Sequence, residues 1–245
     1  MPAPTVGAGH GPGCQHGGTG VRVEVYLELA PKRTFAGAVD WPGWCRSGRG
    51  EAEALAALLA YGRRYAAAIA SGEPTFVPPV APAELVVVER LQGDATTDFG
   101  APSRAPSADA RPLDEGSLER QLRLLGAAWG ALDAAAAGAR GLELRKGPRG
   151  GGRDLGAVLA HVLGAEVAYL ARLGAKMPSP AAGDRGDELA VEREAIRDAL
   201  VAAARGLPAA LPSRSAAHWT ARYFVRRAAW HVLDHAWEIE DRAIR

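Results

Sequence analysis

The sequence predicts an α+β protein in which a small mixed domain precedes an antiparallel four-helix bundle. Residues 21–29 alternate apolar and polar side chains, as a half-buried strand does. Residues 51–70 are rich in Ala and Leu and contain no Pro, which is typical of a helix. Four later segments carry apolar residues at helical spacing. These segments are 117–137, 155–173, 188–205 and 218–242.

The N-terminal domain is expected to span residues 21–92. Residues 35–39 follow the first strand as its hairpin partner, and 44–46 fit a short third strand. Between them, Asp40-Trp-Pro-Gly43 has the residues of a tight turn. Residues 85–91 are apolar and β-branched, which predicts a fourth strand after the helix.

Two further segments carry no periodic pattern. Residues 1–20 are rich in Gly and Pro and are expected to form a disordered tail. Residues 93–114 contain several Pro, Ser, Asp and Ala residues and predict a linker to the bundle domain, residues 115–245. Phe99 is expected to anchor this linker against the bundle.

Composition excludes several classes of function. A formal net charge of +1 argues against a nucleic-acid-binding protein. The first twenty residues have no Lys or Arg and no apolar core, so we expect no signal peptide. No stretch of about 18 apolar residues is evident, so we expect no membrane partner. The two cysteines suggest no disulfide framework, so a cytoplasmic protein fits best. The partner we expect is a small-molecule substrate.

The histidine spacing points to a metal site. His231 and His235 are four residues apart, so both side chains leave one face of the last helix. His161 lies in the middle of another amphipathic helix. Three imidazoles would hold a divalent metal and leave one position open, as in catalytic zinc sites. The alternative is that each is an ordinary histidine of a bundle. His218 lies about 220° around the helix from His231 and is not expected to be a ligand.

Charged residues near these histidines suggest further roles. Asp234 and Glu238 lie on or beside the ligand face, where either could act as a general base or orient an imidazole. The alternative is an ion pair with Arg227 or Arg242 of the same helix. Arg149 and Arg153 belong to a Gly-rich loop, residues 145–153, that precedes the helix of His161. This loop could bind an anion of a substrate or cofactor, or be an ordinary solvated loop.

Residues 153–166, which contain His161, together with the later His231-x-x-x-His235, resemble the DinB-like four-helix-bundle metalloprotein superfamily. The resemblance covers about residues 113–245. It implies that these three histidines bind a divalent metal, often zinc or nickel. It also implies an activity among the low-molecular-weight-thiol-dependent transferases and isomerases.

The N-terminal domain resembles the HicB-like fold. Asp40-Trp-Pro-Gly43, followed by Gly48 and Glu51-Ala52, carries this resemblance over about residues 21–91. In HicB antitoxins a DNA-binding domain accompanies this unit, whereas here a predicted bundle follows it.

Two hypotheses of function follow. The first is a metal-dependent enzyme, a thiol-dependent transferase or isomerase, with metal-assisted hydrolysis as the next choice. The second is a non-catalytic metal-binding or interaction protein, in which the HicB-like domain binds a ligand or protein and the bundle forms a homodimer.

Overall fold

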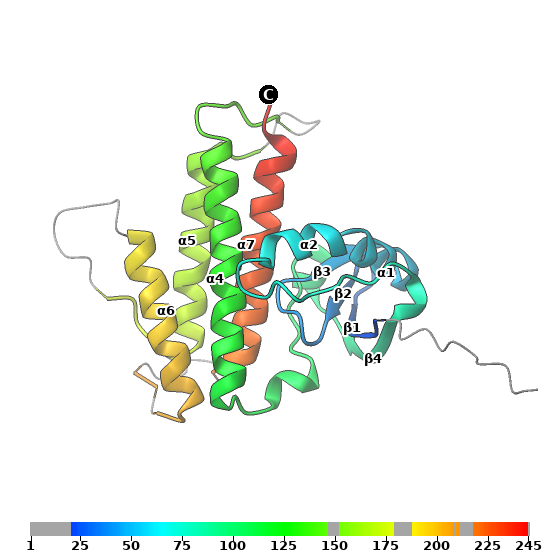
Figure 1. Ribbon diagram of the computed structural model, residues 1–245, viewed down its shortest axis with the longest axis horizontal. Coiled ribbons are helices and arrows are strands. Elements are labelled where there is room, and N and C mark those ends of the chain that lie inside the picture. Colours follow the sequence, from blue (N-terminus) through cyan, green and yellow to red (C-terminus); the bar gives the residue numbers. More distant parts are fainter. Residues whose placement is uncertain (1–20, 147–151, 179–187, 208, 211–217, 245) are drawn as a thin grey trace, which may run out of the picture.

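The computed structural model describes residues 21–146, 152–178, 188–207, 209–210 and 218–244. Within these ranges the protein combines one four-stranded sheet with seven α-helices, as Figure 1 shows. The α+β prediction is confirmed at this level. The expected disordered tail, residues 1–20, lies outside the described residues.

The sheet has the order β3-β2-β1-β4. Its strands are β1 (Val23–Leu29), β2 (Thr34–Ala38), β3 (Cys45–Gly48) and β4 (Leu85–Gln92). β2 pairs antiparallel with both β1 and β3, while β4 lies parallel to β1. The four predicted strands are therefore present, each within about two residues of the expected bounds.

The predicted helix over 51–70 is divided in two, α1 (Glu51–Ala60) and α2 (Gly62–Ile69). At the break, the Tyr61 amide donates to the carbonyls of both Ala57 and Leu58 at 3.2 Å, a tightened last turn. A 3-10 turn, η1 (Pro82–Glu84), then leads into β4.

β1 is buried on both faces, not on one as predicted. Val25 and Leu27 belong to the hydrophobic core, and Tyr26 and Glu28 on the opposite face are equally buried. The reason is that α7 and the segment between β4 and α4 cover the second face. Arg226 of α7 lies over the ring of Tyr26, and Ser103 binds Glu28.

Four long helices form the bundle. They are α4 (Glu115–Gly138), α5 (Leu155–Arg172), α6 (Glu188–Ala204) and α7 (Ala221–Arg242). α4 and α7 run in one direction, and α5 and α6 both run in the other (Figure 1). Four bundle helices are therefore present, but the prediction that they are antiparallel is wrong for one successive pair, because α6 is parallel to α5. More than a dozen residues separate these helices, enough for the chain to return along the bundle.

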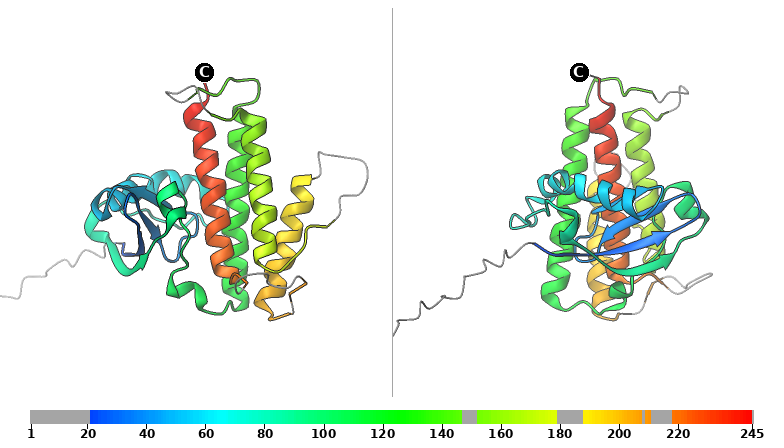
Figure 2. Two further views of the ribbon diagram at one scale, coloured as in Figure 1. Left: turned by 180° about the vertical axis from the view of Figure 1, so that it is seen from behind. Right: turned by 90° about the vertical axis from the view of Figure 1, so that its right-hand side faces the viewer.

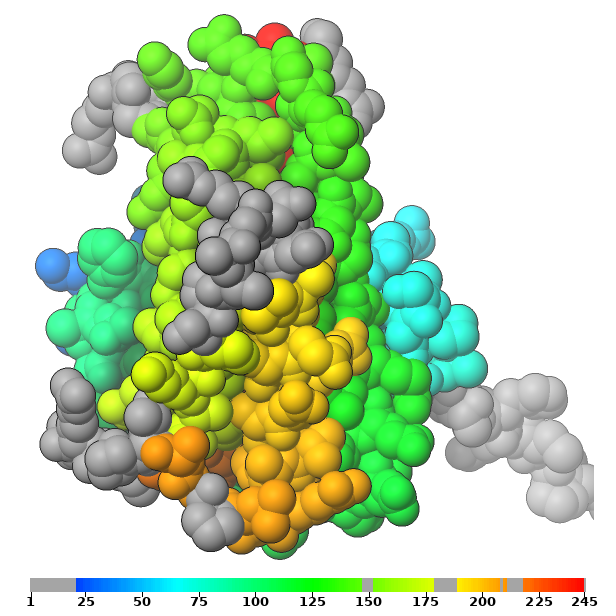
Figure 3. Space-filling view, turned by 90° about the vertical axis from the view of Figure 1, so that its left-hand side faces the viewer, coloured from blue at the N-terminus to red at the C-terminus, as the bar shows by residue number. Residues whose placement is uncertain are grey.

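The sheet and α6 lie on opposite sides of the other three bundle helices, α4, α5 and α7 (Figure 2). Figure 3 shows α6 lying along α5 and α4 on the side away from the sheet.

Residues 93–114 are more ordered than a linker. They contain α3 (Ala95–Phe99) and a 3-10 turn, η2 (Ser107–Ala110). The buried carboxylate of Glu28 accepts hydrogen bonds from the amides of Ser103 at 2.9 Å and Arg104 at 3.1 Å, which fixes this segment to the sheet. Phe99 is 90% exposed, so the expectation that it anchors the segment is wrong.

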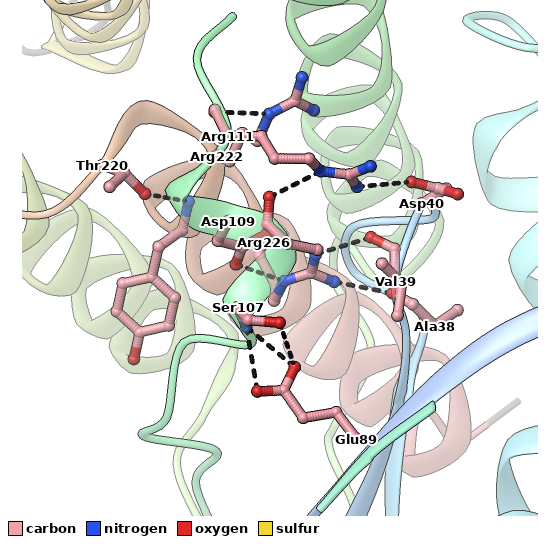
Figure 4. Close-up of polar contacts among 12 residues, drawn as sticks. Ala38, Val39, Asp40, Glu89, Ser107, Asp109, Arg111, Thr220, Arg222 and Arg226 are labelled. Atoms are coloured by element: carbon pink, nitrogen blue, oxygen red, sulfur yellow. Dashed lines mark hydrogen bonds and ion pairs between the residues drawn. The ribbon is translucent and has the colours of Figure 1, made fainter. Parts of the chain in front are cut away.

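A buried arginine joins the two parts of the molecule. Arg226 of α7 donates two hydrogen bonds of 2.7 Å to Asp109 of η2. It also donates to the carbonyls of Ala38 and Val39, at the end of β2, at 2.7 and 2.6 Å (Figure 4). The guanidinium is thereby satisfied inside the interface between sheet and bundle, which share one hydrophobic core.

Among the described helices, α5 alone has the length and composition to cross a membrane, with a mean hydropathy of 1.3 over 18 residues. The sequence-based exclusion of such a segment is therefore too strict. A core helix passes the same test, and α5 packs here against α6 and α7.

Candidate metal centre

Three histidines of two antiparallel helices meet in the bundle. His161 projects from α5, and His231 and His235 project from α7. One nitrogen of each ring lies within 4.8 Å of one nitrogen of both others. His231 and His235 are only 7% and 8% exposed, and His161 is half-buried. The predicted trio is thus brought together.

Local sequence explains how the two helices hold this geometry. Asp154 accepts the Ala157 amide at 2.7 Å and caps the start of α5, as predicted. Val158 and Val162, three residues before and one after His161, are buried and fix that face of α5 toward the core. Thr220 accepts the Tyr223 amide and caps α7.

His218 lies before the start of α7, not within the helix as predicted. It is not among the clustered histidines of the described chain. His218 is still not expected to be a ligand, but the reason is that it lies outside the cluster and before α7, not that it faces the other side of that helix.

The distances fit a shared cation. Nε2 of His161 and Nε2 of His231 are 3.3 Å apart. Two nitrogens bound to one zinc at about 2.0–2.1 Å with tetrahedral angles lie about 3.3 Å apart. The ring centroids of His161 and His231 lie 5.0 and 4.6 Å from that of His235. The three residues therefore fit one divalent metal ion.

Electrostatics favour the neutral form, which binds metal, for two of these rings, those of His161 and His231. Burial, followed by the charges of His235 and Arg227, lowers the pKa of His231 to about 2. Burial, followed by Arg153 and His235, lowers the pKa of His161. Only the neutral imidazole is a metal ligand, so His231 need lose no proton to bind metal at neutral pH.

Glu238 orients one of the ligands. Nδ1–H of His235 donates to Glu238 at 2.7 Å, which leaves Nε2 of His235 for a metal. Arg242 donates to the other oxygen of the same carboxylate. The hydrogen bond from His235 is the largest of the effects that lower the pKa of Glu238 to about 2. Of the predicted roles, this geometry matches the orienting one, combined with the alternative ion pair to Arg242.

Asp234 is placed differently. Its carboxylate accepts a hydrogen bond of 2.7 Å from Arg46 of β3, and both side chains are partly exposed. The guanidinium of Arg46 also lies 4.0 Å above the ring of Tyr61. Asp234 thus belongs to the contact between sheet and bundle. Because its carboxylate binds Arg46, the geometry does not match the role of general base suggested for it.

The predicted anion loop is described only at its ends, and Arg149 lies outside the described residues. Arg153 is exposed, and its carbonyl accepts a hydrogen bond of 2.7 Å from Arg242. Arg242 also donates to the carbonyl of Arg145 at 2.9 Å. The residue that supports Glu238 therefore also ties both ends of this loop to α7.

Sequence reasoning missed Tyr169 as a neighbour of the histidines and considered Arg227 only as a possible ion-pair partner of Asp234 or Glu238, which bind Arg46 and Arg242 instead. Tyr169 of α5 lies with its ring centroid 5.9 Å from that of His231. Arg227 of α7 lies 5.4 Å from the Tyr169 ring. The available signal was spacing, because Arg227 precedes His231 by four residues and must share its face of the helix.

No family model, curated protein or solved structure matches this chain.

Proposed function

We propose that this protein is a metal-dependent enzyme that uses His161, His231 and His235 to bind a divalent metal, zinc or nickel. The observation that carries the proposal is the 3.3 Å separation of the two Nε2 atoms from different helices. Two lone pairs directed at each other in a buried site are unfavourable unless a proton or a cation lies between them. The third imidazole beside them favours the cation.

Three protein ligands also favour catalysis over a purely structural role, since structural zinc sites usually have four. Among the described residues no fourth His, Cys, Asp or Glu joins the cluster. A metal with an open position would supply Lewis-acid chemistry and lower the pKa of a bound water or thiol.

The protein supplies the setting for that chemistry. Glu238 fixes the orientation of His235, and burial keeps His231 neutral. Resemblance of the histidine pattern to the DinB-like superfamily supports transfer or isomerisation with a low-molecular-weight thiol as the reaction class. The N-terminal unit contributes Arg46, which holds Asp234 of the helix that carries His231 and His235.

The test is metal stoichiometry. Protein purified without chelators is expected to carry about one equivalent of metal, measured by plasma emission spectrometry. His231→Ala should lose it while retaining helical circular dichroism. His218→Ala is the matched control, because His218 is also a half-buried histidine but lies outside the cluster. Wild-type protein that binds neither zinc nor nickel in titration would contradict the proposal.

A further inference from the structure

Arg227 shares its surroundings with His231. The two residues are one helical turn apart on α7, and the same two aromatic rings flank both. The guanidinium carbon of Arg227 lies 4.6 Å from the ring centroid of Trp230 and 5.4 Å from that of Tyr169. The centroid of His231 lies 6.1 and 5.9 Å from these rings. The guanidinium of Arg227 is therefore held at the edge of the proposed metal site.

Both residues present a buried polar atom without a hydrogen-bond partner. These atoms are Nη1 of Arg227 and Nδ1 of His231. Because Nε2 of His231 faces His161, Nδ1 carries the proton when Nε2 binds a metal, and Nδ1 is then a donor. Arg227 is always a donor. Two buried donors, one of them charged, thus lack an acceptor.

The neighbouring histidine shows what is missing. His235 is followed by a carboxylate, Glu238, which accepts from its Nδ1 and from Arg242 together. In the described chain no carboxylate pairs with Arg227, and none accepts from Nδ1 of His231. Asp234 follows His231 at the same spacing as Glu238 follows His235, but its carboxylate binds Arg46 instead. The surroundings of His231 therefore have the ring and the arginine but lack a carboxylate that accepts from them.

We propose that the substrate supplies this carboxylate, which Arg227 and Nδ1–H of His231 bind together. The inference rests on the proposed function and names its substrate class, a small molecule that carries a carboxylate beside the group that meets the metal. An uncompensated guanidinium favours an anion over a water molecule, because charge-assisted hydrogen bonds are about twice as strong as neutral ones. Arg153, whose charge also reaches His231, adds to the positive potential.

The test uses cobalt(II)-loaded protein and two thiols of equal length, 3-mercaptopropionate and 3-mercapto-1-propanol. Both reach the metal through sulfur, and only the first carries a carboxylate. Their dissociation constants are measured from the visible absorption of the bound cobalt. We expect wild-type protein to prefer the carboxylate, and Arg227→Met to reduce that preference by about tenfold to a hundredfold. The alcohol should bind both proteins equally.

Two further variants sharpen the result. Arg197→Met removes another half-buried arginine that lies 5.3 Å from an aromatic ring, that of Trp129, and should leave the preference unchanged. Arg227→Lys keeps the charge without the planar fork and should retain part of the preference. Any preference that survives in Arg227→Met comes from the remaining groups, Nδ1–H of His231 and the charge of Arg153, or from chelation of cobalt by the probe itself.

Equal preference in wild type and Arg227→Met, with both proteins folded and loaded, overturns the inference and leaves the metal site intact. Failure of wild-type protein to show a cobalt spectrum overturns the proposed function itself. The two failures are therefore distinguishable.

Discussion

Glu238 lies between a ligand imidazole and an arginine, and its replacement should weaken the metal site without removing a ligand. Glu238→Gln keeps the shape of the side chain but removes the charge that makes His235 a better donor of electrons to the metal. We expect the zinc dissociation constant to rise by about tenfold to a hundredfold, measured by competition with a chromophoric chelator.

Glu240→Gln is the control for that measurement. Glu240 is two residues further along α7 and pairs with Arg64 at 2.6 Å, on the side that faces the sheet. Its replacement should leave zinc affinity unchanged. Equal affinities for Glu238→Gln and wild type would show that the carboxylate does not support the site.

Glu192 of α6 is a second residue whose effect can be measured, because its burial should lower the stability of the folded protein. It is fully buried, and neither carboxylate oxygen has a hydrogen-bond partner. Burial, followed by the charge of Glu166, raises the pKa of Glu192 to about 8. The folded state therefore holds a proton that the unfolded state releases, and stability falls as pH rises from about 4.5 to about 8.

Glu192→Leu should remove this dependence. At pH 8.5 we expect the variant to be about 1–3 kcal/mol more stable than wild type in urea denaturation, with a smaller gain at pH 5. Glu194→Leu, at an exposed position of the same helix, should give no such pH-dependent gain. A loss of stability at pH 8.5 in Glu192→Leu would mean that the buried carboxylate has a stabilising partner.

The turn between β2 and β3 is an element whose conformation depends on one glycine. Gly43 has a φ of 93°, and a Cβ there would approach Cδ1 of Leu233 to 2.9 Å and Cβ of Ala229 to 3.1 Å. Gly43→Ala should therefore cost about 1–3 kcal/mol, from backbone strain and from displacement of the turn from α7.

Gly130→Ala tests the same chemical change in an unconstrained element. Gly130 is exposed in the interior of α4, and apart from its chain neighbours and the backbone of its own helix, no atom of the described chain lies within 4 Å of the position that an added methyl group would take. Because alanine favours helix, this variant should gain about 0.5–1 kcal/mol. Thermal denaturation of both variants checks the opposite signs, and a neutral Gly43→Ala would place the turn away from α7.

Elements with a local signal could be predicted from the sequence. Alternation indicated β1, helical spacing and the Asp154 cap indicated α5, and the i,i+4 pair indicated two of the three clustered histidines. The direction of α6 could not be predicted in this way, because it depends on the path of a long connection.

Contacts between distant residues were also beyond local patterns. Arg46 and Asp234 are 188 positions apart, and the sequence shows nothing that links them. Glu28 is a polar residue in an alternating strand, a pattern that predicts exposure to water. It is buried because a segment more than 60 residues later covers it.

At the scale of the whole molecule, sheet and bundle form one packed body. Their shared core and the buried Arg226 predict that they unfold together. Arg226→Met would leave Asp109, 2% exposed, as an unpaired buried charge, and would free the carbonyls of Ala38 and Val39. Removing one partner of such a pair costs about 3–5 kcal/mol.

We expect Arg226→Met to shift a single urea transition by that amount, followed by circular dichroism. Asp109→Asn in addition should restore part of the loss, because no ionised group then remains unpaired. Arg64→Met at the exposed part of the same interface should cost at most about 1 kcal/mol. Equal small losses for Arg226→Met and Arg64→Met, or two separate transitions in wild type, would show that the two parts are joined by the chain alone. A single transition makes the folding of α7, which carries two of the three clustered histidines, depend on the sheet that packs against it.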